Sequence, residues 1–196
     1  MLFLYQNCKI VALTENLVES ISKFDCGHAD LNDFFRNDSF KYSKELFGKT
    51  YCFVLNDNPS EIVCAFTVAN DSIKQNQLPS SRKKILTASI PREKIMRSYP
   101  AVLIGRLGVS TNFKKQGIGT ELLDFIKLWF IDENNKTGCR FIVVDAYNDE
   151  CVLNFYKKNG FVFMFSTEEQ EKNYLKVKTD YKLHTRFLYF DLVLIR

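Results

Sequence analysis

The residues best suited to chemistry lie in a short basic turn, Lys114-Lys115-Gln116-Gly117-Ile118-Gly119-Thr120. An apolar, strand-like segment (residues 101–109) precedes this turn, and an amphipathic helical pattern (residues 121–131) follows it. The first N–H groups of a helix have no acceptor inside the helix, and with the helix dipole they attract anions. Gly117 and Gly119 have no Cβ that would keep a phosphate from the backbone. The pattern therefore predicts a phosphate-bearing ligand here, although a tight turn with solvated lysines remains an alternative.

Two segments together resemble the GNAT superfamily of N-acetyltransferases. The turn resembles its coenzyme A-binding motif, Arg/Gln-x-x-Gly-x-Gly/Ala, with Lys114 in the first position. Residues 149–161 resemble its second signature, Asn/Asp-x-x-Ala-x-x-x-Tyr-x-x-x-Gly-Phe, with Cys151 in place of alanine. The resemblance implies acetyl-CoA as the co-substrate and no metal. It also implies a mixed α/β fold whose sheet splays between its fourth and fifth strands, here residues 103–109 and 141–146.

The resemblance assigns expected roles to individual residues. Tyr156 would be the general acid that protonates the leaving thiolate, although packing in the core is the alternative for this side chain. Asn148 and Asn154 would contact the coenzyme, with a cap or a surface position equally open. The strand edge would pair with the pantetheine arm, and the turn would hold the diphosphate; these residues are Leu107, Gly108, Val109, Lys114, Lys115, Gln116, Gly117, Ile118, Gly119 and Thr120.

A general base is not identifiable, because residues 101–109 contain no carboxylate. Proton removal could pass through water to backbone carbonyls, or the amine could arrive already neutral. A non-catalytic module that keeps the fold as an acyl-CoA sensor is therefore a second hypothesis.

The N-terminal half narrows the resemblance to the acetyltransferase toxins of toxin–antitoxin pairs, which acetylate the α-amine of aminoacyl-tRNA. The similar segments are Phe24–Gly27, Leu31–Phe34, Ile104–Val109 and Val144–Ala146, although Gly108 stands where alanine is common. This resemblance implies an aminoacyl-tRNA acceptor and an antitoxin partner. A small-molecule or protein amine is the competing acceptor.

A tRNA acceptor requires a cationic surface. The candidates for it are Arg82, Lys83, Lys84, Arg92, Lys94, Arg97 and Arg106. The first six could equally form a solvated loop, whereas the charge of Arg106, on a central strand, should face a cleft or find a partner.

Composition sets the wider frame. The length of 196 residues suits one domain spanning residues 1–196. The net charge of +4 suits a partner with phosphates. Six scattered cysteines and two histidines without metal-ligand spacing indicate buried free thiols rather than a zinc site. No long apolar run or signal peptide is recognisable, so we expect a cytoplasmic protein without membrane contact, as a monomer or homodimer.

Local patterns predict a mixed, mostly antiparallel α/β sheet with one parallel section and flanking helices. The predicted strands are residues 8–13, 50–55, 62–69, 86–90, 101–109, 140–146, 161–165 and 187–195. The predicted helices are residues 15–23, 31–47 (with Asp30 as N-cap), 121–131 and 149–159. Residues 72–84 read as an exposed loop, and residues 166–184 as either a short helix or a flap.

Overall fold

A computed structural model describes residues 2–91 and 96–196 of the chain, which fold as two compact units. The first unit contains the chain up to Asn70 together with Ile104–Trp129, and the second contains Asp71–Leu103 together with Phe130–Arg196. The expectation of a single domain stays a prediction. Among the described helices, none combines the length and apolar character needed to cross a bilayer.

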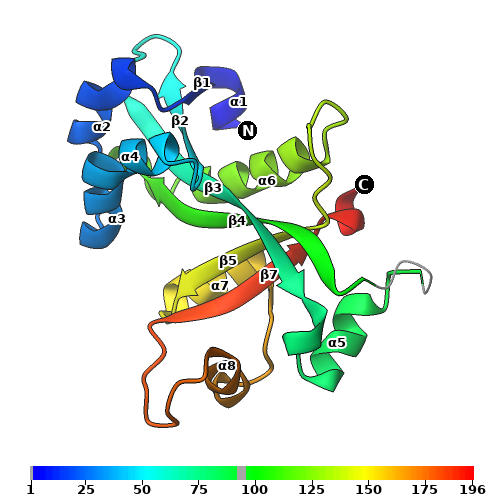
Figure 1. The fold of residues 1–196 in the computed structure, drawn as a ribbon. Coiled ribbons are helices and arrows are strands. Elements are labelled where there is room, and N and C mark those ends of the chain that lie inside the picture. The colour runs from blue at the N-terminus through cyan, green and yellow to red at the C-terminus, as the bar shows by residue number, and fades with distance from the viewer. Residues whose placement is uncertain (1, 92–95) are drawn as a thin grey trace. The chain divides into compact units, whose positions relative to one another are not determined.

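The described residues form seven strands in the hydrogen-bonded order β1-β2-β3-β4-β5-β7-β6 (Figure 1). The strands are β1 Cys8–Ala12, β2 Lys49–Leu55, β3 Ile62–Lys74, β4 Ser98–Val109, β5 Phe141–Tyr147, β6 Val162–Phe163 and β7 Thr185–Asp191. The pairs β1–β2, β2–β3, β5–β7 and β6–β7 are antiparallel.

The remaining pairings make the sheet mixed. Ser110 N–H donates to Val63 O and Gln75 N–H to Arg97 O, so β3 and β4 run antiparallel. Arg140, just before β5, donates its N–H to Pro100 O near the start of β4, so these two strands run parallel. The predicted fold class, a mixed and mostly antiparallel α/β sheet flanked by helices, is confirmed. The wedge expected between residues 103–109 and 141–146 stays a prediction.

In the first unit, β2 is covered on both faces because its side chains alternate. Tyr51 and Phe53 meet the rings of Trp129 and Phe125 on α6 (Ile118–Ile131) edge-on, with centroids 4.8 and 4.9 Å apart. Cys52 and Val54 instead join a cluster with Phe24 and Phe35. The N-terminal helices are α1 Phe3–Asn7, α2 Val18–Lys23, α3 Ala29–Asp33 and α4 Ser39–Lys44. α1 contacts α6 instead, because the Tyr5 N–H donates to Glu121 Oε1 at 3.2 Å.

The predicted helix over residues 31–47 is interrupted. Between α3 and α4 the backbone forms a π-helical segment, Phe34–Asp38, which packs Phe35 into the core with no exposed surface. The N-cap is His28 rather than Asp30, which lies in the first turn. The sequence missed the π segment because packing of Phe34 and Phe35, not a local pattern, selects it.

In the second unit, β5 and β7 form the centre and α7 (Glu150–Lys158) lies alongside them (Figure 1). Phe141, Val143 and Tyr189 share one face of this pair with Leu86 and other core residues. The opposite face carries the paired Ile142 and Phe190. The continuous apolar run in β5 is therefore a strand buried on both faces, as predicted.

Two predictions in the second unit are wrong. Residues 72–84 are not a loop, because β3 continues to Lys74 and α5 spans Ser80–Thr87. The end of α5 and the turn after it also replace the strand predicted at 86–90. The sequence did not indicate this helix because its residues are mostly polar. The helix buries Leu86, and Arg82 donates from Nε to Met164 O (2.8 Å) and from Nη2 to Phe163 O. Short 3₁₀ turns complete the chain at Glu15–Leu17, Gln75–Gln77, Thr111–Phe113 and Leu192–Ile195.

The last predicted strands are shorter than expected. β6 is Val162–Phe163, and β7 ends at Asp191, where the final 3₁₀ turn begins. The segment 166–184, left open between helix and flap, contains α8 (Glu168–Leu175). Its Glu171 is buried, accepts Arg186 Nε at 2.7 Å and also accepts the Phe187 N–H at 2.7 Å. These contacts attach α8 to β7.

The two glycines of β4 should respond differently to alanine. A Cβ at Gly108 would lie 3.0 Å from Cys26 Cβ and 3.2 Å from Phe35, whereas at Gly105 the nearest atom would be Thr67 O at 3.9 Å. Gly108→Ala should therefore lower the free energy of unfolding by about 1–3 kcal/mol through overpacking. The matched control, Gly105→Ala, should stay within about 0.5 kcal/mol. Urea unfolding measures both, and equal effects would contradict this packing argument.

Candidate functional site

The predicted anion-binding turn is built by a 3₁₀ turn followed by two left-handed residues. Ser110 accepts the Asn112 N–H at the start of the 3₁₀ turn. Lys115 and Gly117 then have positive φ values of 61° and 81°. α6 begins at Ile118, where Glu121 N–H donates to Gly117 O at 3.1 Å. The N–H groups before Glu121 therefore precede the helix's own hydrogen-bond ladder.

The surroundings of this turn fit an anion. Residues 114–117 are exposed, and among the described residues no atom beyond Gly117 and its two chain neighbours lies within 4 Å of a Cβ added at Gly117. Ile118 is buried, which fixes the helix while its first turn stays open to solvent. The backbone donors, two lysines and open space are the features that bind phosphate at a helix start.

The structure also brings a segment to this turn that the sequence did not assign to it. Lys114 Nζ lies 2.8 Å from the place where a Cβ on Gly27 would sit. Thr111 N–H donates to Asp25 O at 2.9 Å. The pKa of Asp25 is lowered, mainly because the Gly27 N–H and the Asn32 amide donate to its carboxylate, with Arg36 and Lys114 contributing positive charge. The sequence marked this segment by its resemblance to the toxins and by Asp-Cys-Gly, a turn-forming pattern, but neither signal placed it beside the turn.

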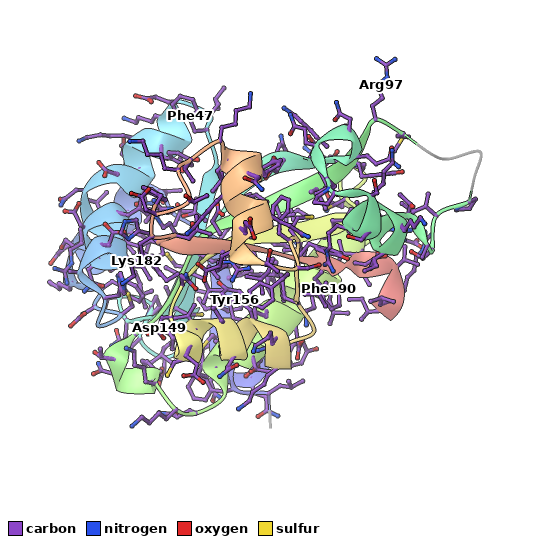
Figure 2. All side chains as sticks on the ribbon, turned by 90° about the horizontal axis from the view of Figure 1, so that it is seen from below. Phe47, Arg97, Asp149, Tyr156, Lys182 and Phe190 are labelled. Carbon is purple, nitrogen blue, oxygen red and sulfur yellow. The ribbon has the colours of Figure 1, made fainter. Side chains whose placement is uncertain are left out.

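The predicted cations have different environments. Arg106 finds a partner within the first unit, because its guanidinium lies 4.8 Å from the Phe34 ring centroid and donates to Gly105 O. Arg82 is occupied by the two carbonyls described above, so the expectation of an exposed loop cation is wrong. Lys83, Lys84 and Arg97 are exposed in the second unit, as the view of Arg97 in Figure 2 shows. Arg92 and Lys94 lie outside the described residues.

Tyr156 belongs to the second unit, on the side of α7 that faces the sheet (Figure 2). The helix starts at Asp149, whose carboxylate accepts the N–H groups of Cys151 and Val152. The Tyr156 ring packs edge-on against Phe161, which in turn contacts Phe190. Burial raises the pKa of Tyr156 well above its usual range, so the phenol stays neutral and keeps its proton.

The two asparagines expected near the coenzyme also belong to the second unit. Asn148 donates from Nδ2 to Glu168 Oε1 (3.1 Å) and to Leu183 O (3.0 Å), while its N–H donates to His184 O. It therefore fastens the segment 166–184 to the end of β5. Asn154 is half-buried on α7.

The cysteines do not favour nucleophilic catalysis. All six are free, and Cys8, Cys26, Cys52 and Cys64 are buried, as predicted. The prediction is wrong for Cys151, which is exposed on α7, and Cys139 is only partly buried. Burial raises the pKa of Cys52 to about 12 and that of Cys8 to about 11, so these thiols stay protonated and weakly nucleophilic. Among the described side chains, no group of three or more His, Cys, Asp or Glu is arranged to hold a metal ion.

Comparisons with known proteins agree with this arrangement. Residues 49–163 match the family described as acetyltransferase (GNAT) domain. Similar solved structures include a KacT mutant (20% identity, 97% of this chain and 98% of that chain, TM-score 0.72). A second is AtaT complexed with acetyl-methionyl-tRNAfMet (21% identity, 96% of this chain and 97% of that chain, TM-score 0.70). A third is AtaTR bound with AcCoA (19% identity, 96% of this chain and 96% of that chain, TM-score 0.68). At these identities the likeness shows a shared fold.

The strained turn predicts a gain in stability from glycine at position 115. A left-handed non-glycine residue costs about 1–2 kcal/mol, and the added freedom of glycine in the unfolded chain costs about 0.4–1 kcal/mol. Lys115→Gly should therefore raise the free energy of unfolding by about 0.5–1 kcal/mol relative to Lys115→Ala, which removes the same charge but keeps the strain. Denaturant unfolding compares the two variants; a less stable glycine variant would contradict the strain.

The buried phenol predicts a dependence of stability on alkaline pH. The pKa of Tyr156 is higher in the folded chain than in the unfolded chain, where it is about 10. Tyr156 therefore contributes fully to the free energy of unfolding below about pH 10, and this contribution is lost as the pH rises through the folded pKa. Between about pH 9 and 11 the free energy of unfolding of the parent chain should therefore fall by about 1 kcal/mol more than that of the Tyr156→Phe variant. The free energy of unfolding of the Tyr5→Phe variant, which lacks an exposed phenol, should fall by as much as that of the parent over the same pH range. Identical pH curves for the parent and Tyr156→Phe would refute this.

Proposed function

Because the chain belongs to the GNAT acetyltransferase family, we propose that it transfers the acetyl group of acetyl-CoA to a primary amine, the α-amine of an aminoacyl-tRNA. The single observation that supports this most is the turn at residues 114–120. It combines exposed lysines, left-handed residues at 115 and 117 and a helix start with open space beside Gly117.

In this proposal the turn holds the diphosphate of the coenzyme. The N–H groups of residues 116–120 donate to phosphate oxygens, and Lys114 and Lys115 add positive charge. Leu107, Gly108 and Val109 offer the backbone edge of β4 to the pantetheine arm. When bound, the coenzyme supplies an acetyl thioester, which reacts with a neutral amine.

Tyr156 is the proposed proton donor in this reaction. Its buried, neutral phenol keeps the proton that the departing thiolate needs. The described part of β4 contains no carboxylate. We therefore assign removal of the amine proton to water or to backbone carbonyls rather than to an acidic side chain. Asn154 lies two residues from Tyr156, and we keep it as a proposed coenzyme contact; Asn148, with its amide donating to Glu168 and Leu183, has the weaker case.

The choice of acceptor and partner rests on the resemblance to toxin–antitoxin acetyltransferases. One solved structure is of AtaT complexed with acetyl-methionyl-tRNAfMet, and another is of an AtaT mutant toxin bound to the C-terminus of the antitoxin AtaR and acetyl-CoA. Lys83, Lys84 and Arg97 are exposed cations that suit contact with RNA phosphates. We propose an antitoxin partner on the same basis.

The purified chain with acetyl-CoA and charged tRNA should yield N-acetylated aminoacyl-tRNA, measured by mass spectrometry after mild hydrolysis. Tyr156→Phe should lower kcat by about 100-fold or more, with the Kd for acetyl-CoA within about twofold, because only proton donation is lost. The control, Tyr174→Phe, removes a half-buried phenol from the second unit and should leave kcat unchanged.

The remaining outcomes separate the alternatives. Acetylation of small amines or peptides but not of charged tRNA would move the acceptor to another class. Binding of acetyl-CoA without transfer to any amine would favour a sensor module. If the chain does not bind acetyl-CoA, the whole proposal is wrong. If turnover is unchanged in Tyr156→Phe, only the role of Tyr156 as the general acid is wrong.

A further inference from the structure

The loop Phe24-Asp25-Cys26-Gly27, here called the anchoring loop, lies where β4 passes into the phosphate-binding turn. Its Asp25 O accepts the Thr111 N–H at 2.9 Å, directly between the two regions. Cys26 packs on Gly108 of β4, close enough that a Cβ there would lie 3.0 Å from Cys26 Cβ. One loop therefore contacts both the strand edge and the turn.

The anchoring loop is fixed by hydrogen bonds from the helices that follow it. Arg36 donates to Phe24 O from Nε (3.1 Å) and Nη2 (2.8 Å). Asn32 accepts the Cys26 N–H at 2.8 Å and donates to Asp25 Oδ1 at 2.6 Å. The Gly27 N–H also donates to Asp25 Oδ1, at 2.7 Å. The loop is thus a held element rather than a freely moving one.

Gly27 is where this loop meets Lys114. Its φ of +69° belongs to the left-handed region, and a Cβ there would lie 2.8 Å from Lys114 Nζ and 3.3 Å from Thr111 Cγ2. The ammonium group therefore occupies the space that the missing side chain leaves. The nearby Asp25 carboxylate keeps its charge through two donated hydrogen bonds, and its field favours the ammonium at this position.

We propose that Gly27 is a positioning residue, which lets the anchoring loop hold the Lys114 ammonium beside the phosphate-binding turn so that it meets a phosphate of the coenzyme. The inference rests on the proposed function, because the ligand is the coenzyme of that reaction. Any side chain at position 27 would displace the ammonium. Since the displaced atom is the end of a flexible side chain, the fold should tolerate this movement.

A double-mutant cycle with coenzyme A as the probe tests the inference. Gly27→Asn suits it because asparagine accepts left-handed φ values better than most residues. Calorimetric titration should show a Kd about twofold to fivefold higher than the parent, the size of one exposed ion contact. In the Lys114→Ala background the same substitution should change the Kd less than about 1.5-fold, because the displaced charge is already absent.

Two controls separate positioning from general damage. Gly138→Ala should leave the Kd unchanged, because Gly138 does not have a positive φ and an added Cβ there would meet none of the described residues within 4 Å beyond its chain neighbours. The effect of Gly27→Asn should also disappear near 1 M salt, where the Debye length falls to about 3 Å. Thermal unfolding confirms that each variant is folded at the titration temperature, and Gly27→Ala serves as a second variant if the asparagine variant is not.

The outcomes are distinct. An equal rise in Kd with and without Lys114, or one that persists in high salt, would overturn the positioning role while leaving coenzyme binding intact. An unchanged Kd in Gly27→Asn would do the same. A parent chain that does not bind coenzyme A would overturn both the inference and the proposed function.

Discussion

The structure of the candidate site depends on one constraint, which is that α6 must be buried along its length and exposed at its start. Leu122, Leu123 and Ile126 have no exposed surface, so the helix is fixed against the strands of the first unit. Its first N–H groups nevertheless need acceptors from outside the helix. The left-handed backbone at Lys115 and Gly117 turns the chain from β4 into this helix without placing a side chain over those donors. An anion is the natural complement of such an end.

The second unit solves a different problem, that of keeping a phenol protonated. The alternating faces of β5 and β7 leave an apolar surface, and α7 packs Tyr156 into it beside Phe161. The capping carboxylate of Asp149 starts this helix at a defined residue and so fixes which side chain points inward. Burial then favours the neutral phenol. The packing of Tyr156 therefore also sets its protonation state.

The segment 166–184 illustrates how polar residues can be structural. Its α8 is tied down by Glu171, which is almost fully buried and pairs with Arg186. Asn148 joins the same arrangement through Glu168 and Leu183. Buried charges are retained only when partners satisfy them, and here each carboxylate oxygen of Glu171 accepts a hydrogen bond. An asparagine that resembles a ligand contact in the sequence is therefore part of this attachment.

The sequence by itself determined the elements with strong periodicity: β2 and β3 with their turn, α6, β5 and α7. Apolar spacing and caps are local signals, and they carried the two GNAT signatures with them. α5 was missed because its apolar content is small and its arginine bonds to distant carbonyls. The π segment was missed because core packing chooses it.

Only the tertiary structure decided which distant residues meet. Cys26 occupies the space that a side chain at position 108 would need, and Gly27 lies against Lys114 although the two are far apart in the chain. No local pattern encodes such contacts, since they arise when separate elements pack around one core. The sequence alone thus determined which segments carry the family signatures, and the folded chain decided which neighbours hold them in place.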